Sequence, residues 1–234
     1  MAKKASGKHE SLAASAYSPP PQARPELGTI VDLLPRAVVL PGARLKEVFL
    51  AYLPTLGRIA PKEVLYFHTT RLDLDTDGKT TSWGKTKAES SHQGQTSLDK
   101  RAHSHKIDKE NSDSNVLPYF VLPLRDAKTD SEWVGKDHGV MLGDVGVIIG
   151  KNKVVFAQFA DAGPAGKLGE ASIAVHRAFG QDDVTGRARL RNTDLGGPFV
   201  TLVFPGTAPP KLRLTPTEIA TLGRTLFTKL GGLA

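Results

Sequence analysis

The stretch Lys153–Gly180, KVVFAQFADAGPAGKLGEASIAVHRAFG, combines a strand pattern, a glycine-rich turn and a short amphipathic segment. Its β-branched and aromatic residues predict a strand that ends near Asp161. The sequence AGPAG at 162–166 predicts a turn, because Gly and Pro favour the backbone conformations that turns require. After Glu170, apolar residues recur with helical spacing up to Gly180, which predicts a short helix. The turn therefore reverses the chain between two carboxylates.

Asp161 and Glu170 are the candidate catalytic residues. Each lies at the edge of an apolar element, so the turn can bring both to one cleft. Hydrolysis of a glycosidic bond requires such a pair, with one carboxyl group protonated and the other ionised. We expect Glu170 to be the acid, because neighbouring apolar residues would raise its pKa, and Asp161 to be the base. The opposite assignment of the two roles stays open.

The same segment resembles the strand–turn–helix segment of the family 75 chitosanases, which carries the pattern Asp-x-Gly-Pro…Gly-Glu-Ala-Ser-Ile. The residues that fall on this pattern in register are Asp161, Gly163, Pro164, Gly169, Glu170, Ala171, Ser172 and Ile173. More loosely, the similarity extends over about residues 65–206. It implies that Asp161 and Glu170 are the catalytic pair of an endo-acting hydrolase, which cleaves β-1,4-linked glucosamine polymers with inversion.

An acidic segment, RLDLDTDG, precedes this region at 71–78. Alternation places Asp73, Asp75 and Asp77 on one side of a strand, where like charges repel unless a cation lies near them. One interpretation is a calcium loop, although Gly84 stands where the final Glu of an EF-hand loop would be. A second is binding of glucosamine ammonium groups, and a third is a plain strand edge entering a turn. The resemblance favours the second, because those chitosanases carry a similar segment.

Further substrate-binding residues are expected in the polar segment 79–115 and the strand after it. Gln93, Gln95 and Thr96 resemble a Gln/Thr/Ser motif of the same family, and their amide and hydroxyl groups suit sugar hydroxyls. Tyr119 fits the family's Pro-Tyr-x-Val segment and completes this set. We expect no metal and no cofactor, because the chain has no cysteine and no phosphate-binding glycine loop.

Composition favours a mainly β protein. The chain of 234 residues is 39% hydrophobic and contains 23 Gly and 16 Pro, which is typical of turn-rich folds. The pattern of strand, Asp, Gly turn and short helix also resembles the double-psi barrels of lytic transglycosylases, which implies an antiparallel, six-stranded β-barrel of that kind with a few short helices. Residues 1–26 are expected to form a disordered tail, and residues 27–234 a single catalytic domain. Within that domain, Leu45–Leu53 has helical spacing, and Thr215–Glu218 reads as the capping box of a terminal helix.

Charge leaves the substrate open between two polysaccharides. A net charge of +7 favours polyanionic partners, whereas chitosan is a polycation, so an acidic cleft would be needed to bind it. Peptidoglycan is the alternative substrate, for a glycosidase or for a lytic transglycosylase that uses Asp161 alone. A second alternative is a non-catalytic polysaccharide-binding module. We expect a monomer that binds no nucleic acid.

Targeting signals are not evident in the sequence. No run approaches 18 apolar residues, so no membrane span is expected. The first residues lack the apolar core of a signal peptide, although the expected polymer is extracellular. The sequence therefore leaves the localisation unknown.

Overall fold

The computed structural model of the chain describes residues 38–39, 50–53, 64–79, 93–124, 133–181 and 194–229. The expected disordered tail, residues 1–26, lies outside these residues. Within them the strands are β1 (Val38–Val39), β2 (Leu50–Leu53), β3 (Val64–Asp75), β4 (Tyr119–Pro123), β5 (Val145–Gly150), β6 (Lys153–Gly163), β7 (Glu170–Ser172) and β8 (Leu195–Phe204). The helices are α2 (Ser97–Ser104), α3 (Ile173–Ala178), α4 (Pro216–Lys229) and the short 3₁₀ helix η3 (Lys136–His138).

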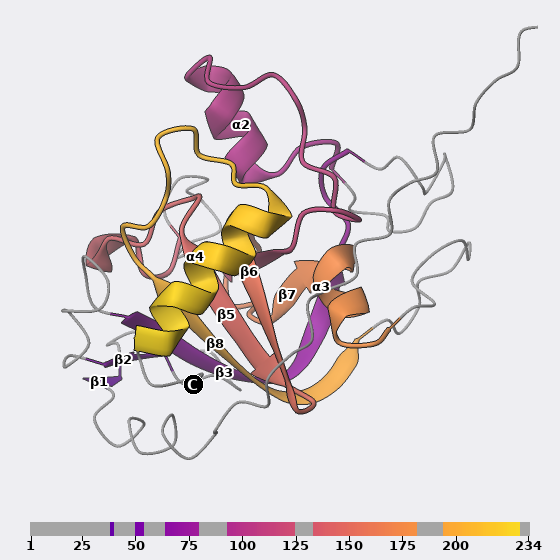
Figure 1. Cartoon of the computed structure of the whole chain (residues 1–234), viewed down its shortest axis with the longest axis vertical. Coiled ribbons are helices and arrows are strands. Elements are labelled where there is room, and N and C mark those ends of the chain that lie inside the picture. The colour runs from indigo at the N-terminus through magenta and orange to yellow at the C-terminus, as the bar shows by residue number, and fades with distance from the viewer. Residues whose placement is uncertain are drawn as a thin grey trace, which may run out of the picture.

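Six strands close into a barrel in the order β3-β7-β4-β6-β5-β8, and β8 pairs again with β3 (Figure 1). The expected six-stranded barrel with short helices is therefore confirmed. Its strands are mixed rather than wholly antiparallel, since β3 pairs with β7, and β4 with β6, in parallel. The parallel pair β4–β6 forms where β4 inserts between β6 and β7, the two strands that the glycine-rich turn connects. The sequence predicts the turn but not this insertion.

Aromatic rings fill the core beside β4 and β6. Phe120 stacks on Phe159 with ring centroids 5.8 Å apart, and Trp133 meets Phe159 edge-on at 5.5 Å. The indole Nε1 of Trp133 donates a hydrogen bond of 2.8 Å to the carbonyl of Val140. Helix α4 lies across β5 and β6 (Figure 1), where Phe227 contacts Phe156 edge-on. These contacts fix the strands that carry the acidic residues described below.

One local prediction is wrong. The helical spacing of Leu45–Leu53 predicts a helix, but Leu50–Leu53 forms β2, which pairs antiparallel with the first residues of β3. Backbone pairing with a long neighbouring strand outweighs a weak helical preference here. The short helix expected before Gly180 is confirmed as α3, while the preceding residues 170–172 form β7, an unpredicted strand that pairs with both β3 and β4.

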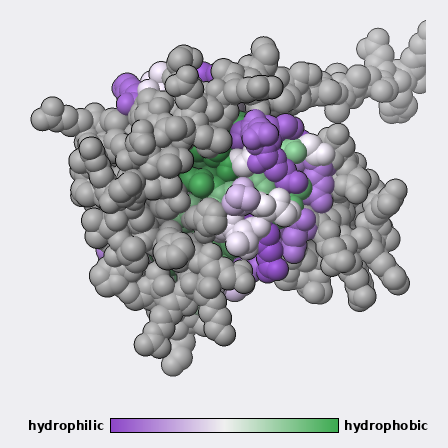
Figure 2. Space-filling view, turned by 90° about the horizontal axis from the view of Figure 1, so that it is seen from below, coloured by the Kyte–Doolittle hydropathy of each residue, from purple (hydrophilic) through white to green (hydrophobic). Residues whose placement is uncertain are grey.

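The capping box at the start of α4 is confirmed. The backbone N–H of Glu218 donates to the Thr215 hydroxyl at 3.3 Å, and the Thr215 N–H donates to the Glu218 carboxylate at 2.7 Å. None of the helices in the described ranges has the length and apolar character needed to cross a membrane. Seen from below in Figure 2, the visible described surface combines an apolar area with a hydrophilic border.

We predict that Phe159→Ala lowers the free energy of unfolding by about 3–5 kcal/mol, the usual cost of removing a buried Phe ring. Phe159 is fully buried and contacts two other rings. Urea unfolding measures the change. The matched control is Val116→Ala, because Val116 is 59% exposed and its truncation should change stability by less than about 0.5 kcal/mol. Equal effects of both substitutions would contradict a core role for Phe159.

Candidate active site

A row of acidic residues crosses the barrel wall through four neighbouring strands. Val121 of β4 pairs with Asp161 of β6 on one side and with Glu170 of β7 on the other. Glu170 in turn pairs with Asp73 of β3. Because residues opposite one another on paired strands point to the same face, Asp73, Glu170, Val121 and Asp161 share one face. We call Asp73, Asp75, Asp77, Asp161 and Glu170 the acidic row.

The missing side chain of Gly163 makes room for the carboxylate of Glu170. A Cβ placed on Gly163 would lie 2.8 Å from Glu170 Oε2 and 2.9 Å from Val121 Cγ1. The Glu170 side chain therefore reaches over Val121 toward β6 and approaches that strand at Gly163, two residues after Asp161. This glycine belongs to the same motif that carries both acids, and its physical role is to let Glu170 approach the strand of Asp161.

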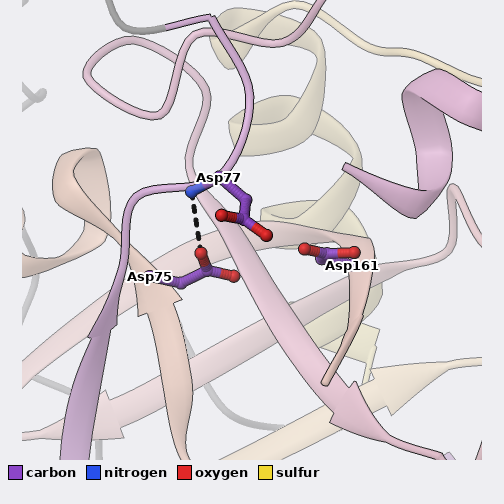
Figure 3. A group of neighbouring side chains, drawn as sticks. All are labelled: Asp75, Asp77 and Asp161. Atoms are coloured by element: carbon purple, nitrogen blue, oxygen red, sulfur yellow. Dashed lines mark hydrogen bonds between the residues drawn. The ribbon is translucent and has the colours of Figure 1, made fainter. Parts of the chain in front are cut away.

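Asp75, Asp77 and Asp161 form the tightest part of the acidic row. One oxygen from each carboxylate lies within 4.8 Å of the other two, and Figure 3 shows the three groups turned toward one another. The N–H of Asp77 donates to Asp75 Oδ1 at 2.8 Å, and Asp77 Oδ1 accepts the N–H of Gln93 at 2.6 Å. Burial, together with the charges of Asp161 and Asp77, raises the pKa of Asp75 well above its usual range. A retained proton on Asp75 reduces the repulsion within this group.

Oxygen donors for a cation are present at this point. The three carboxylates offer ligand atoms of the kind that Ca²⁺ and Mg²⁺ prefer. Two of the oxygens already accept backbone hydrogen bonds, from Asp77 and from Gln93. We propose no metal role for this group.

The first residue of α2 holds Asp161 in place. Ser97 donates to Asp161 Oδ1 twice, from its N–H at 2.8 Å and from its hydroxyl at 2.6 Å. The N–H of Ala162 adds a third hydrogen bond of 2.8 Å to the same oxygen. Burial raises the pKa of Asp161 overall above its ordinary value, although the hydrogen bonds from Ser97 and Ala162 and the charge of Lys100 reduce the rise. The donors thus favour the ionised form that burial opposes.

Lys167 lies between the other two acids of the row. Its ammonium pairs with Glu170 and lies 3.4 Å from Asp73 Oδ2. Burial alone would lower the pKa of Lys167, but the hydrogen bond and charge of Glu170, followed by those of Asp73, raise it overall. Burial and the charge of Asp194 raise the pKa of Asp73, against the charges of Lys167 and Arg71.

The remaining expected substrate-binding residues differ in how far they are exposed to solvent. Gln93 is exposed and its side chain accepts a hydrogen bond from Lys100. Gln95 donates to Asn111 at 3.2 Å. Thr96 and Tyr119 are fully buried: Thr96 caps α2, and the Tyr119 hydroxyl donates to the carbonyl of Asp77 at 3.0 Å. The structure therefore shows Thr96 and Tyr119 holding neighbouring segments in place.

A buried ion-pair network supports α2 and was not predicted. Asp99 is fully buried and accepts hydrogen bonds from the N–H of Thr96 and from Ser112. Arg213, from the segment before α4, donates to Asp99 at 2.7 Å and to Asp108 at 2.6 Å. The Thr-x-x-Asp spacing at 96–99 is the sequence signal for the cap, but the sequence has no local signal for a partner more than a hundred residues away.

Comparison with known families agrees with this geometry. Residues 72–220 match the family model described as fungal chitosanase of glycosyl hydrolase group 75. The match covers more than half of the chain and includes the whole acidic row. None of the curated proteins matches the chain.

We predict that buried His176 makes the protein less stable as pH falls. Its ring Nε2 lies 3.0 Å from the carbonyl oxygen of Asp73, and burial lowers its pKa below the ordinary 6.5, despite the opposing hydrogen bonds. Below that pH the unfolded chain binds a proton that the folded protein resists, so this contribution to stability falls as pH drops through 6.5.

Denaturant unfolding of wild type and His176→Gln at several pH values tests this contribution. The stability difference between the two proteins should shrink as pH falls below 6.5. His105→Gln serves as the control, because His105 is exposed. A difference that stays constant over this range, or grows toward low pH, would contradict the prediction.

Proposed function

We propose a specific reaction for this chain, which belongs to glycosyl hydrolase family 75 and is a chitosanase-type glycoside hydrolase. In this proposal the enzyme cleaves β-1,4-linked glucosamine polymers internally and with inversion, using Asp161 and Glu170. The observation that carries the proposal is the register of β4, which sets the two acids on either side of Val121.

The spacing of the two strands supports inversion. Neighbouring strands lie about 4.8 Å apart, so two spacings separate the backbones of Asp161 and Glu170 by about 10 Å. Inverting glycosidases hold their carboxyl groups about 6.5–9.5 Å apart to admit a water molecule, whereas retaining enzymes need about 5–5.5 Å. The Glu170 side chain leans back toward β6, so the two carboxyl groups lie closer together than the two backbones. A pair that flanks one intervening strand suits the wider arrangement.

The surroundings of Asp161 support its role as the base. Three hydrogen bonds reach one oxygen of its carboxylate, two of them from the first residue of α2. The N-terminus of a helix stabilises a negative charge. An ionised Asp161 can accept a proton from the attacking water, and Glu170 then protonates the leaving oxygen.

The acidic row also supports a cationic substrate. Its five carboxylates lie on or beside one face of the barrel wall, although the whole chain carries a net charge of +7. The surroundings of the proposed catalytic pair are therefore acidic, whereas the chain as a whole is basic. Glucosamine units carry primary ammonium groups that pair with carboxylates, which reconciles a basic protein with a polycationic polymer.

We predict that Asp161→Asn and Glu170→Gln each reduce hydrolysis of soluble chitosan by about 10²–10⁴-fold, the usual contribution of a general acid or base. Reducing-end release measures the rate, and NMR of the first product gives the anomer, which should be inverted. The matched controls are Asp137→Asn and Glu218→Gln, two substitutions outside the acidic row.

Other outcomes of this experiment would overturn parts of the proposal. Retained activity in either acid variant would remove that residue from the pair. Release from purified peptidoglycan but not from chitosan would replace the substrate. A product with retained configuration would exclude the inverting mechanism.

We also predict that Ser97→Ala moves the acidic limb of the pH–rate profile to higher pH. The Ser97 hydrogen bonds lower the pKa of Asp161, so removal of the hydroxyl raises it and the base is protonated at a pH where wild type is still active. Loss of a hydrogen bond to a charged group costs about 1.5–3 kcal/mol, so activity below the limb should fall about 10-fold or more. Ser104→Ala at the other end of α2 is the control. An unshifted limb would contradict this role.

A further inference from the structure

Lys167 occupies the space where the acidic row would hold a cation. Lys167 is the last residue of the turn Pro164–Lys167, which is closed by a hydrogen bond of 3.2 Å from the Lys167 N–H to the Pro164 carbonyl. Gly166 has φ of +83°, the conformation that a type II turn requires at its third position. The turn directs the Lys167 side chain to Glu170 and Asp73, whose side chains are only 10% and 11% exposed.

This ion pair opposes the acid role of Glu170. A nearby ammonium favours the ionised form of a carboxyl group, whereas a general acid must carry a proton before the leaving oxygen departs. The ion pair with Lys167 therefore favours the carboxylate form of Glu170. The proposed reaction therefore requires that Lys167 leaves Glu170 when substrate binds.

The ammonium of a glucosamine unit has the same chemistry as the Lys167 side chain. Both are primary ammonium groups with three hydrogen-bond donors. On Asp73, Lys167 contacts Oδ2 at 3.4 Å, whereas Oδ1 is buried and pairs with Arg71 Nε at 2.9 Å. A substrate ammonium at Asp73 Oδ2 would therefore take the place of the Lys167 ammonium and repel it.

We propose that Lys167 is a specificity-determining residue that acts as an internal stand-in for the substrate ammonium. It pairs with Asp73 and Glu170 until a glucosamine ammonium takes its place at Asp73 alone, which leaves Glu170 without an ammonium partner. A neutral N-acetylated unit lacks the charge that displaces Lys167. This inference rests on the proposed function, because it assigns one step of substrate recognition to the same site.

The position of Lys167 allows this exchange. Its side chain is 38% exposed, and the preceding residues Pro164–Gly166 are exposed as well. A lysine side chain carries its charge on a flexible four-carbon stem, so the ammonium can move into water without a change in the barrel. The anchored ends of the turn hold the backbone in place, since the carbonyl of Gly169 accepts the N–H of Asp73.

Calorimetric binding to a hydrolysis-deficient background tests the inference. Asp161→Asn and the double variant Asp161→Asn with Lys167→Gln are titrated with glucosamine hexamer and with N-acetylglucosamine hexamer. We expect Lys167→Gln to tighten binding of glucosamine hexamer about 10-fold and to change binding of the acetylated hexamer less than about twofold. Lys167→Arg keeps the charge and should leave both affinities near those of the background. Lys211→Gln breaks an exposed ion pair with Glu218 and is the matched control.

The outcomes separate this inference from the proposed function. If Asp161→Asn binds glucosamine hexamer but Lys167→Gln weakens or does not change that binding, Lys167 is a direct substrate contact or a bystander, and the inference is wrong. Equal tightening of both hexamers would also overturn it, because the effect would not depend on substrate charge. If neither variant binds glucosamine hexamer while thermal unfolding shows both folded, the proposed substrate fails, and the inference fails with it.

Discussion

The insertion of β4 between β6 and β7 is the constraint on which the site depends. Two strands joined by a tight turn would ordinarily pair with each other, and their acids would then lie one strand spacing apart. Here Val121 pairs with Asp161 on one side and Glu170 on the other, which separates the acids by a second spacing. Gly163 then lets the Glu170 side chain lean back across Val121. Strand order and one absent side chain together set the geometry of the pair.

The second feature of this site is the way in which the repulsion among its carboxylates is reduced. Five carboxylates close together would be costly unless each charge is offset. Hydrogen bonds from Ser97 stabilise Asp161, a raised pKa favours a retained proton on Asp75, and Lys167 pairs with Asp73 and Glu170. Of these three stabilising interactions, only the one with Lys167 uses a primary ammonium, the group that a glucosamine unit also carries. A site that supplies its own counter-ion can remain folded when empty and still favour a charged ligand.

The sequence predicts much of this arrangement because some signals are local. The motif at 161–173 identifies Asp161 and Glu170 as neighbours in one turn, and alternation predicts that Asp73 and Asp75 share a face. Composition and turns also predict a turn-rich β fold. What the sequence does not contain locally is the register between strands: the short strand β7 has no signal of its own, and the partners Ser97 and Asp161 are 64 residues apart. Arg213 and Asp99 are 114 residues apart, so no local pattern in the sequence predicts their ion pair.

The members of the acidic row lie far apart in the sequence, so the row forms only when distant parts of the chain fold together. Its members come from β3, from the segment after β3, from β6 and from β7, and β4 must already separate the last two. Folds dominated by such distant pairings form slowly, because chain ends must meet before contacts stabilise them. A partly folded chain would therefore hold all five acids without bringing them together. Activity of this protein toward polysaccharide would then require a closed barrel.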